Sequence, residues 1–226
     1  MRDATHISII IDRSGSMEPI RHDAEGAINH FLSEQQKVEG DCSLLLADFD
    51  GEDPFHVIHD GPLGEFGQYR LSPRGNTPLR DAVGRMLIVT GLRLEGLSED
   101  YRPDKVIIVI QTDGQENASR EYTWEQLTAK IKTQTEVYNW QFIFLGMGAD
   151  SWDQGTRLGV QNIVRSAGTG AAHVNTYDTM STMSTAYRGG MTHDMAGMRV
   201  TVDSAGKVFN EAGEEIDPKT GKVATA

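Results

Sequence analysis

Three separate segments of the chain carry oxygen-bearing side chains at spacings that could bind a metal ion. A carboxylate and two hydroxyls stand at alternate positions directly after an apolar run, at Asp12, Ser14 and Ser16. Thr77 lies in a Gly-Asn-Thr-Pro turn, and Asp113 follows a second apolar run. Hard oxygen donors of this kind are the ligands that Mg2+, Mn2+ and Ca2+ prefer. The residue types therefore predict a divalent-metal site, provided that the three segments meet in space.

The elements that must position these residues alternate along the chain. Short β-branched runs predict strands, and apolar residues at helical spacing predict the helices between them. The predicted strands cover residues 6–11, 42–49, 55–59, 106–110, 141–146 and 162–164. The predicted helices cover residues 18–38, 79–94, 123–136, 151–158 and 171–187, with Thr123 as the N-cap of the third. This alternation predicts a three-layer, Rossmann-like α/β fold with a mostly parallel open sheet and helices on both faces.

One strand is expected to run against the others. A turn-like segment, residues 50–54, separates the strand at 42–49 from the strand at 55–59, so the two should form a hairpin. The shorter strand is therefore predicted to be antiparallel and at an edge of the sheet.

The predicted fold also explains how distant donors could converge. In an open α/β sheet, ligands bind beyond the carboxyl ends of the strands. Asp12 ends the first strand, Asp113 ends the most apolar strand, and Thr77 begins the helix that precedes that strand. All three segments are therefore expected at one edge of the sheet.

The charge of the donor set distinguishes it from a storage or structural calcium site. Two carboxylates, Asp12 and Asp113, balance one divalent cation, and the remaining donors are uncharged hydroxyls. A structural Ca2+ site would normally contain more carboxylates. Singly, such residues are usually turn formers or helix N-caps. Their joint occurrence on three matching segments favours a metal that still accepts another anionic oxygen.

These segments resemble the metal-ion-dependent adhesion site (MIDAS) of von Willebrand factor type A domains. The resemblance covers residues 1 to about 190 and includes the order Asp-x-Ser-x-Ser, Thr-Pro-Leu and Thr-Asp-Gly-x-x-Asn. The flanking residues look like those of bacterial and phage single-domain members. All the motif positions are present, at Asp12, Ser14, Ser16, Thr77 and Asp113.

The resemblance implies a role for each position. In that family the two serines, here Ser14 and Ser16, bind the ion directly, whereas Thr77 and Asp113 correspond to residues that bind directly or through water. The first aspartate, here Asp12, often acts through water. The family's sixth coordination position is usually filled by an acidic side chain of a partner protein. The implied cofactor is Mg2+, with Mn2+ or Ca2+ as alternatives, and the implied activity is metal-bridged protein binding.

The composition of the chain limits its expected partners and cellular location. The 226-residue chain carries a net charge of −12, which disfavours nucleic acid and anionic membrane as partners. The single cysteine, Cys42, fits a reducing, cytoplasmic setting, or a virion for a phage-encoded protein. The sequence contains no apolar run long enough to span a membrane.

Two parts are expected along the chain. Residues 1–190 form the predicted type A domain, and residues 191–226 form a C-terminal extension. Within the extension, a small hairpin is predicted at residues 200–209 and a polar tail at 210–226. Self-association could use this extension.

Enzymatic alternatives fit the residues less well. A phosphatase of the haloacid-dehalogenase type would place a second carboxylate where this chain has Ser14, and a serine hydrolase would need a Gly-x-Ser-x-Gly frame. The seven histidines form no His-Glu-x-x-His pattern, and no Walker A motif is present. We therefore predict a non-enzymatic binding module. A metal-dependent hydrolase, an assembly component of a phage particle or bacterial complex, and an adaptor of a AAA+ ATPase remain alternatives.

Arg13 lies between the predicted ligands. We expect its side chain to point away from the ion, either toward a partner or into solvent.

Overall fold

A computed structural model of the chain describes residues 4–147, 151–167, 170–190, 198–218 and 220–224. Its strands are β1 (Thr5–Asp12), β2 (Cys42–Phe49), β3 (His56–Pro62), β4 (Lys105–Thr112), β5 (Gln141–Gly146), β6 (Asn162–Ser166), β7 (Arg199–Val202), β8 (Val208–Asn210) and β9 (Glu215–Ile216). Its α-helices are α1 (Arg21–Gln36), α2 (Leu79–Glu95), α3 (Trp124–Tyr138), α4 (Ser151–Arg157) and α5 (Gly170–Arg188). Short 3-10 helices are η1 (Gly15–Ile20), η2 (Leu63–Glu65) and η3 (Glu99–Tyr101).

The strands form one nine-stranded sheet in the order β3-β2-β1-β4-β5-β6-β7-β8-β9. Neighbours from β2 through β7 pair in parallel, and β3 pairs antiparallel with β2 at one edge. The predicted α/β fold and its antiparallel edge strand are confirmed. The opposite edge is antiparallel as well, through β8 and β9. A hairpin was predicted at residues 200–209, but its place in the sheet was not.

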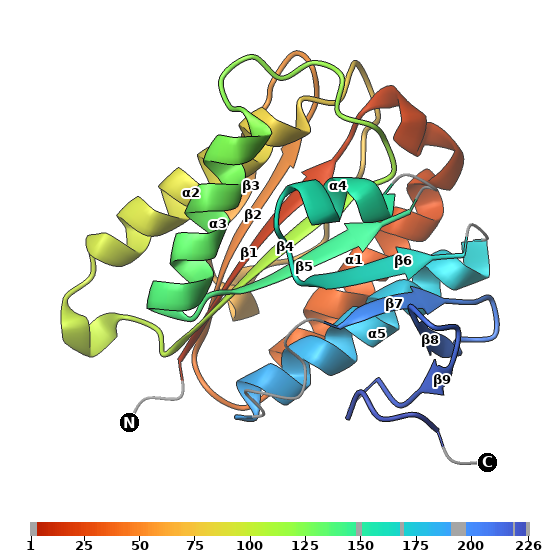
Figure 1. Cartoon of the computed structure of the whole chain (residues 1–226). Coiled ribbons are helices and arrows are strands. Elements are labelled where there is room, and N and C mark those ends of the chain that lie inside the picture. The colour runs from red at the N-terminus through yellow and green to blue at the C-terminus, as the bar shows by residue number, and fades with distance from the viewer. Residues whose placement is uncertain (1–3, 148–150, 168–169, 191–197, 219, 225–226) are drawn as a thin grey trace.

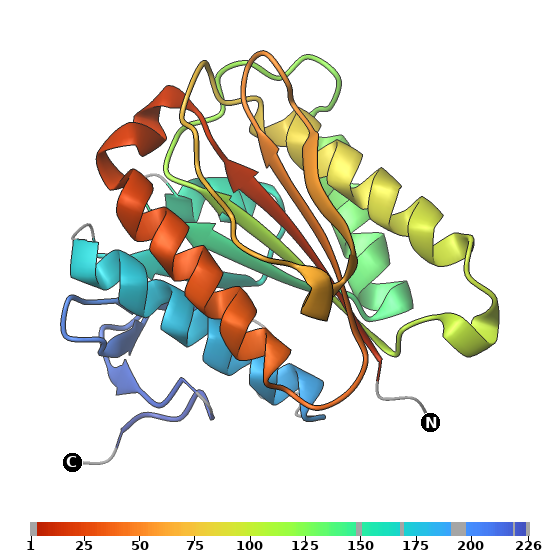
Figure 2. The same cartoon turned by 180° about the vertical axis from the view of Figure 1, so that it is seen from behind.

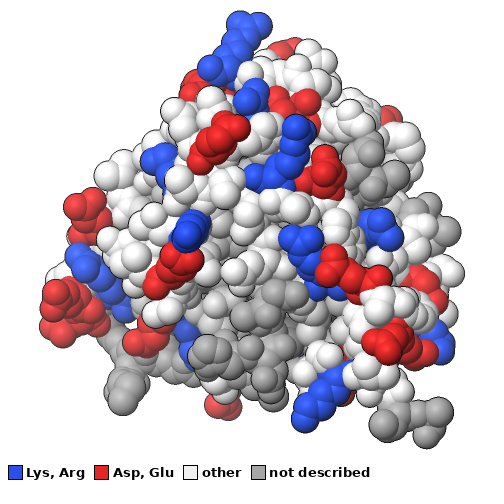
Figure 3. Space-filling view, viewed as in Figure 1, with Lys and Arg blue, Asp and Glu red and all other residues white. Residues whose placement is uncertain are grey.

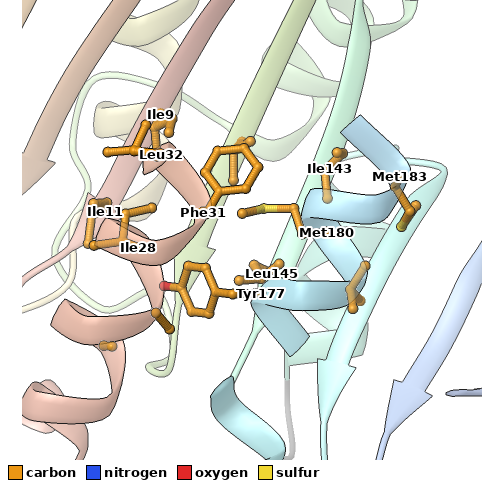
Figure 4. Close-up of a cluster of buried hydrophobic side chains, with 14 of the residues drawn as sticks. Ile9, Ile11, Ile28, Phe31, Leu32, Ile143, Leu145, Tyr177, Met180 and Met183 are labelled. Atoms are coloured by element: carbon orange, nitrogen blue, oxygen red, sulfur yellow. The ribbon is translucent and has the colours of Figure 1, made fainter. Parts of the chain in front are cut away.

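Helices cover both faces of the sheet, so two separate cores form. Figure 1 shows α2, α3 and α4 in front of the sheet, and Figure 2 shows α1 and α5 on the opposite face. Strand β1 is buried along its whole length because its side chains alternate between the two cores. Figure 4 shows the core beneath α1 and α5, where Phe31 of α1 and Met180 of α5 lie side by side above the sheet. Both side chains are fully buried.

Two predicted helix boundaries are informative. The helix predicted at residues 18–38 is divided into η1 and α1. Pro19 lies near the end of η1, two residues before α1 begins, so its missing backbone donor removes no hydrogen bond of α1. Thr123 caps α3 as predicted: its side chain accepts from Gln126 N, and the Gln126 side chain accepts in return from Thr123 N.

The C-terminal third departs from the sequence prediction. The strand at 162–164 is the last that the sequence predicts for the sheet, but β7 continues the sheet in parallel beside it. Strands β7 and β8 form the predicted hairpin. The segment predicted as a polar tail contains β9, and Ile216 makes a further antiparallel bridge with Val223. These strands pack against the rest of the domain because Val200, Val202 and Ile216 are buried in the same core as α5.

The predicted domain boundary between residues 190 and 191 adjoins residues 191–197, which lie outside the described residues. The boundary therefore stays a prediction. Within the described part of the chain, no helix combines the length and apolarity that crossing a bilayer requires.

Candidate metal centre

The carboxyl ends of β1 and β4 bring the first and third predicted segments together. The two strands are parallel neighbours, and Ile11 pairs with Gln111 in their register. Asp12 and Thr112 therefore end the two strands at the same edge of the sheet. Thr112 Oγ1 donates a hydrogen bond of 2.5 Å to Asp12 Oδ2.

The Ser14–Ser16 loop folds over this edge. Ser14 N donates to Asp12 Oδ1 at 2.7 Å, which turns the chain immediately after the strand. The hydroxyls of Ser14 and Ser16 are 3.0 Å apart, and Ser16 Oγ donates to Asp113 Oδ1 at 2.9 Å. Four of the five predicted ligands are thus joined by direct hydrogen bonds.

Thr77 reaches the same place from the second loop. A Cβ built on Gly114 would lie 3.1 Å from Ser16 Oγ, 3.2 Å from Thr77 Oγ1 and 3.6 Å from Asp12 Oδ2. Oxygens from the first two segments therefore surround Gly114 of the third, and Asp113 beside it is bonded to Ser16. Asn117 holds Thr77 there, because its Oδ1 accepts from Thr77 N at 2.9 Å and its own N donates to Thr77 O at 3.1 Å.

The first and second loops are joined through their backbones. Gly15 N donates to Gly75 O at 3.1 Å, and Arg74 N donates to Arg13 O at 2.7 Å. Gly75 has a φ of +67°, a conformation that side chains with a Cβ rarely adopt. This turn sets the direction in which the chain enters Thr77.

Arg13 anchors the first loop to strand β2. Its Nη1 lies 3.2 Å from Asp48 Oδ1, and its Nε lies 2.6 Å from Asp50 Oδ2. Arg74 Nε also donates to Asp50 Oδ2, at 2.7 Å. The expectation that Arg13 points to solvent or to a partner is wrong, because the residue is 7% exposed. Asp48 and Asp50 are themselves buried, and buried carboxylates need a counter-charge.

The third loop is held from α4. Gln154 is buried, its Nε2 donates to Gly114 O at 2.6 Å, and its Oε1 accepts from Glu116 N at 3.1 Å. The carboxylate of Glu116 then accepts from the backbone N–H groups of Ala118 and Ser119. This support could not be predicted from the sequence, because a single glutamine in a short helix carries no recognisable pattern.

Burial disfavours ionisation of both carboxyl groups, those of Asp12 and Asp113. Asp12 is completely buried, and burial raises its pKa to about 6 from the ordinary 3.8. Hydrogen bonds from Thr112 and Ser14 favour the charged form and oppose this shift. Burial also raises the pKa of Asp113. A cation beside the two carboxylates would offset the cost of burying their charges.

The donor set fits a small divalent cation that prefers oxygen. It combines two carboxylates with three hydroxyls and contains no nitrogen or sulfur, the pattern typical of Mg2+ and Mn2+ rather than Zn2+. Elsewhere among the described residues, no group of three or more His, Cys, Asp or Glu side chains is placed to hold a metal. The structure therefore brings the five predicted residues together, and ligation by them stays a prediction.

Comparison with known proteins supports the fold. No protein-family model and no curated protein match the sequence. Among solved structures, the D319A mutant of the PilB minor pilin from Streptococcus sanguinis matches with a TM-score of 0.58 at 12% identity, covering 80% of this chain and 61% of that one. A von Willebrand factor type A structure from Catenulispora acidiphila matches with a TM-score of 0.55 at 12% identity, covering 78% and 42%.

A third similar structure is the pilus adhesin SpaC from Lactobacillus rhamnosus GG in its open conformation. It matches with a TM-score of 0.56 at 13% identity and covers 81% of this chain and 30% of that one. This chain thus spans less than two thirds of the length of each of the three. At these identities the likeness concerns the fold alone, and the fold is that of the von Willebrand factor type A structure.

Proposed function

We propose that the chain is a non-enzymatic, divalent-metal-dependent protein-binding module with a site of the MIDAS type. The observation that carries this proposal is the convergence of Ser16, Thr77 and Asp12 oxygens around Gly114, next to Asp113. Without a cation, hydroxyls and carboxylates from three loops would gain little from lying so close together. Mg2+ is the favoured ion because it combines octahedral oxygen coordination with retained waters.

The proposed role of each residue follows from its contacts. Ser14, Ser16 and Thr77 would supply neutral oxygens, and Asp113 a charged one. Asp12, fixed by Thr112 and by the Ser14 backbone, would hold a negative charge beneath the site. A bound Mg2+ would act as an electrophile, and the two carboxylates would neutralise its charge without making the site negative. A carboxylate of a partner protein therefore gains from approaching it in a partly desolvated setting.

Two further points support binding rather than catalysis. The hydroxyls of Ser14 and Ser16 contact each other and Asp113, and within the described residues neither is hydrogen-bonded to a histidine that could act as a base. One similar structure is a pilus adhesin, so this fold occurs in a protein whose task is attachment. An Asp or Glu on a partner protein, rather than nucleic acid or membrane, is the ligand we propose.

The test separates metal ligation from folding. Mg2+ and Mn2+ binding would be measured by isothermal titration calorimetry on the full chain and on Thr77→Val, which removes one hydroxyl at nearly constant volume. Thr133→Val makes the same change on the exposed outer face of α3 and is the matched control. We expect one ion per chain, weakened about tenfold or more by Thr77→Val and unchanged by the control. Equal binding by both variants would exclude the proposed site.

Partner binding has its own readout. Proteins captured from the source organism by the immobilised chain should be released by chelator and recaptured after Mg2+ is restored. Capture that survives both chelator and Asp12→Ala would contradict metal-bridged binding. A reducing, cytoplasmic location, or a virion, remains part of the proposal and is supported by the single cysteine, Cys42.

The alternative of an assembly component that self-associates through the C-terminal extension also remains a proposal. Strands β8 and β9 support it because they form an edge of the sheet. Truncation is a poor test, since Val200 and Val202 belong to the core beneath α5. Sedimentation of the full chain at increasing concentration, with and without Mg2+, would distinguish metal-independent self-association from a monomer.

A further inference from the structure

A groove whose lining includes none of the predicted metal ligands lies on the face of the sheet that carries α4. It has a volume of about 880 Å3 and is lined by α4, β6, β7 and the β8–β9 turn. In Figure 1, α4 lies in front of the β5–β6 region, whereas no helix crosses in front of β7. The C-terminal strands thus extend the sheet beyond its covering helices and leave part of one face open.

The strand register places a row of side chains along this face. Arg165 of β6 pairs with Thr201 of β7, which pairs in turn with Phe209 of β8. Arg199 is two residues before Thr201 and therefore lies on the same face. Trp152 of α4 lies beside Arg165 in the same lining. We call this set the arginine groove.

Both arginines are held in fixed positions by neutral groups. Arg165 Nη2 donates to Thr201 Oγ1 at 3.1 Å, and its guanidinium carbon lies 5.2 Å from the centre of the Trp152 ring. Arg199 Nη1 donates to Thr156 Oγ1 at 3.1 Å. Such contacts orient the guanidinium groups without neutralising them, and a preorganised guanidinium loses less entropy when it binds an anion.

The groove lining holds two arginines and two carboxylates, and among these described residues only Arg199 and Glu211 form an ion pair. Arg199 lies 3.7 Å from Glu211 Oε1, but the Glu211 side chain is 60% exposed. Asp153, also in the lining, is exposed as well. Among the described residues, no carboxylate forms an ion pair with Arg165. Figure 3, which views this face, shows basic and acidic atoms side by side over the β6–β8 region.

We propose that the arginine groove binds an acidic segment of a partner protein. Its carboxylate would bridge Arg165 and Arg199 and replace the exposed Glu211, because charge-assisted bonds to two guanidinium groups are stronger than one solvent-exposed pair. Trp152 and Phe209 flank the charges and would pack against a neighbouring apolar side chain. The two half-buried aromatic rings favour a peptide over a bare inorganic anion. This second binding face requires no metal and is independent of the function proposed above.

The test uses amide chemical shifts of the labelled full chain in metal-free buffer. The probes are an acetylated Phe-Glu-Asp-Phe amide peptide, its Phe-Gln-Asn-Phe counterpart and inorganic phosphate. We expect the acidic peptide alone to shift the amides of Arg165, Thr201 and Phe209, and Thr77→Val to leave this binding unchanged. Because a charged hydrogen bond is lost in each case, Arg165→Gln and Arg199→Gln should each weaken it about tenfold.

Arg157→Gln is the matched control. It removes the same charge from another arginine that lies 5.2 Å from a tryptophan ring, that of Trp124, outside the groove lining. Should Arg165→Gln fail to fold, Arg165→Lys keeps the charge, loses the planar fork and should still weaken binding. Equal binding of both peptides, or equal effects of Arg157→Gln and Arg165→Gln, would overturn the proposal. Phosphate binding more tightly than the acidic peptide would also overturn it, in favour of a small-anion site.

Discussion

Gly114→Ala should impair metal binding while leaving the fold intact. The added methyl would lie 3.1 Å from Ser16 Oγ and 3.2 Å from Thr77 Oγ1, closer than the 3.4 Å at which ordinary contacts of a Cβ begin. Both hydroxyls must therefore move by a few tenths of an ångström. The backbone itself tolerates alanine, because Gly114 is not among the residues with positive φ.

The expected losses of stability and of Mg2+ affinity depend on how well folding and metal binding tolerate small displacements. Gly114 is only half-buried, so overpacking there should lower the free energy of unfolding by about 1 kcal/mol. Mg2+ demands near-ideal distances of about 2.0–2.1 Å, so displacing two hydroxyl ligands should cost more than the fold loses. We expect Mg2+ affinity to fall between about tenfold and a hundredfold, which corresponds to about 1.4–2.8 kcal/mol.

The assay is titration calorimetry with Mg2+, paired with thermal unfolding in the absence of metal. Gly91→Ala is the control: no atom lies within 4 Å of the added methyl, and α2 should gain about 0.5–1 kcal/mol from the better helix former. Unchanged Mg2+ affinity in Gly114→Ala would refute the reasoning, because the methyl would then contact none of the ligands.

Four further predictions concern the site and its surroundings. Since burial raises the pKa of Asp12 to about 6, Mg2+ affinity should fall about tenfold per pH unit below that value, and titrations across pH should lose this slope in Asp12→Asn. In the metal-free chain the same pKa shift should stabilise the fold by on the order of 3 kcal/mol at low pH. This contribution is fully present below the ordinary pKa of 3.8 and is lost as the pH rises through about 6. Urea unfolding that shows no such trend relative to Asp12→Asn would contradict it. Arg13→Gln removes a cation that two buried carboxylates share, although Asp50 keeps Arg74 and Asp48 keeps Tyr69, and it should cost about 2 kcal/mol in denaturant unfolding. Arg85→Gln breaks an exposed pair and should cost less than about 1 kcal/mol; similar costs would mean that the buried network is not stabilising. Gln154→Ala frees the Gly114 loop and should weaken Mg2+ binding about tenfold in calorimetry, and an unchanged affinity would show that α4 does not position the site.

Much of the architecture follows from local patterns. Continuous apolar runs such as β4 are buried on both faces, so they predict parallel strands directly. The capping residue Thr123 was equally predictable, because the reciprocal bonds of a capping box are local. The hairpin of β7 and β8 was predicted, but its pairing with β6 and the two-residue strand β9 were not, since such short strands carry too little pattern to show where they pair.

In the candidate site, too, local patterns predict some features, whereas others depend on tertiary contacts. Asp12, Ser14 and Ser16 share one loop, and strand alternation alone places Asp113 beside them. The burial of Arg13 could not be predicted in this way. It depends on Asp48 and Asp50 at the end of a neighbouring strand, and only the parallel pairing of β1 with β2 brings these carboxylates to it.

The most direct test of the central claim is a crystal structure of the full chain with Mn2+, located by its anomalous scattering. We predict a single ion between the three loops, within about 2.0–2.6 Å of the hydroxyl oxygens of Ser14 and Ser16, with one coordination position open to an outside carboxylate or water. Crystals soaked in Mn2+ that show no ion there, or an ion only beside Asp48 and Asp50, would contradict the account.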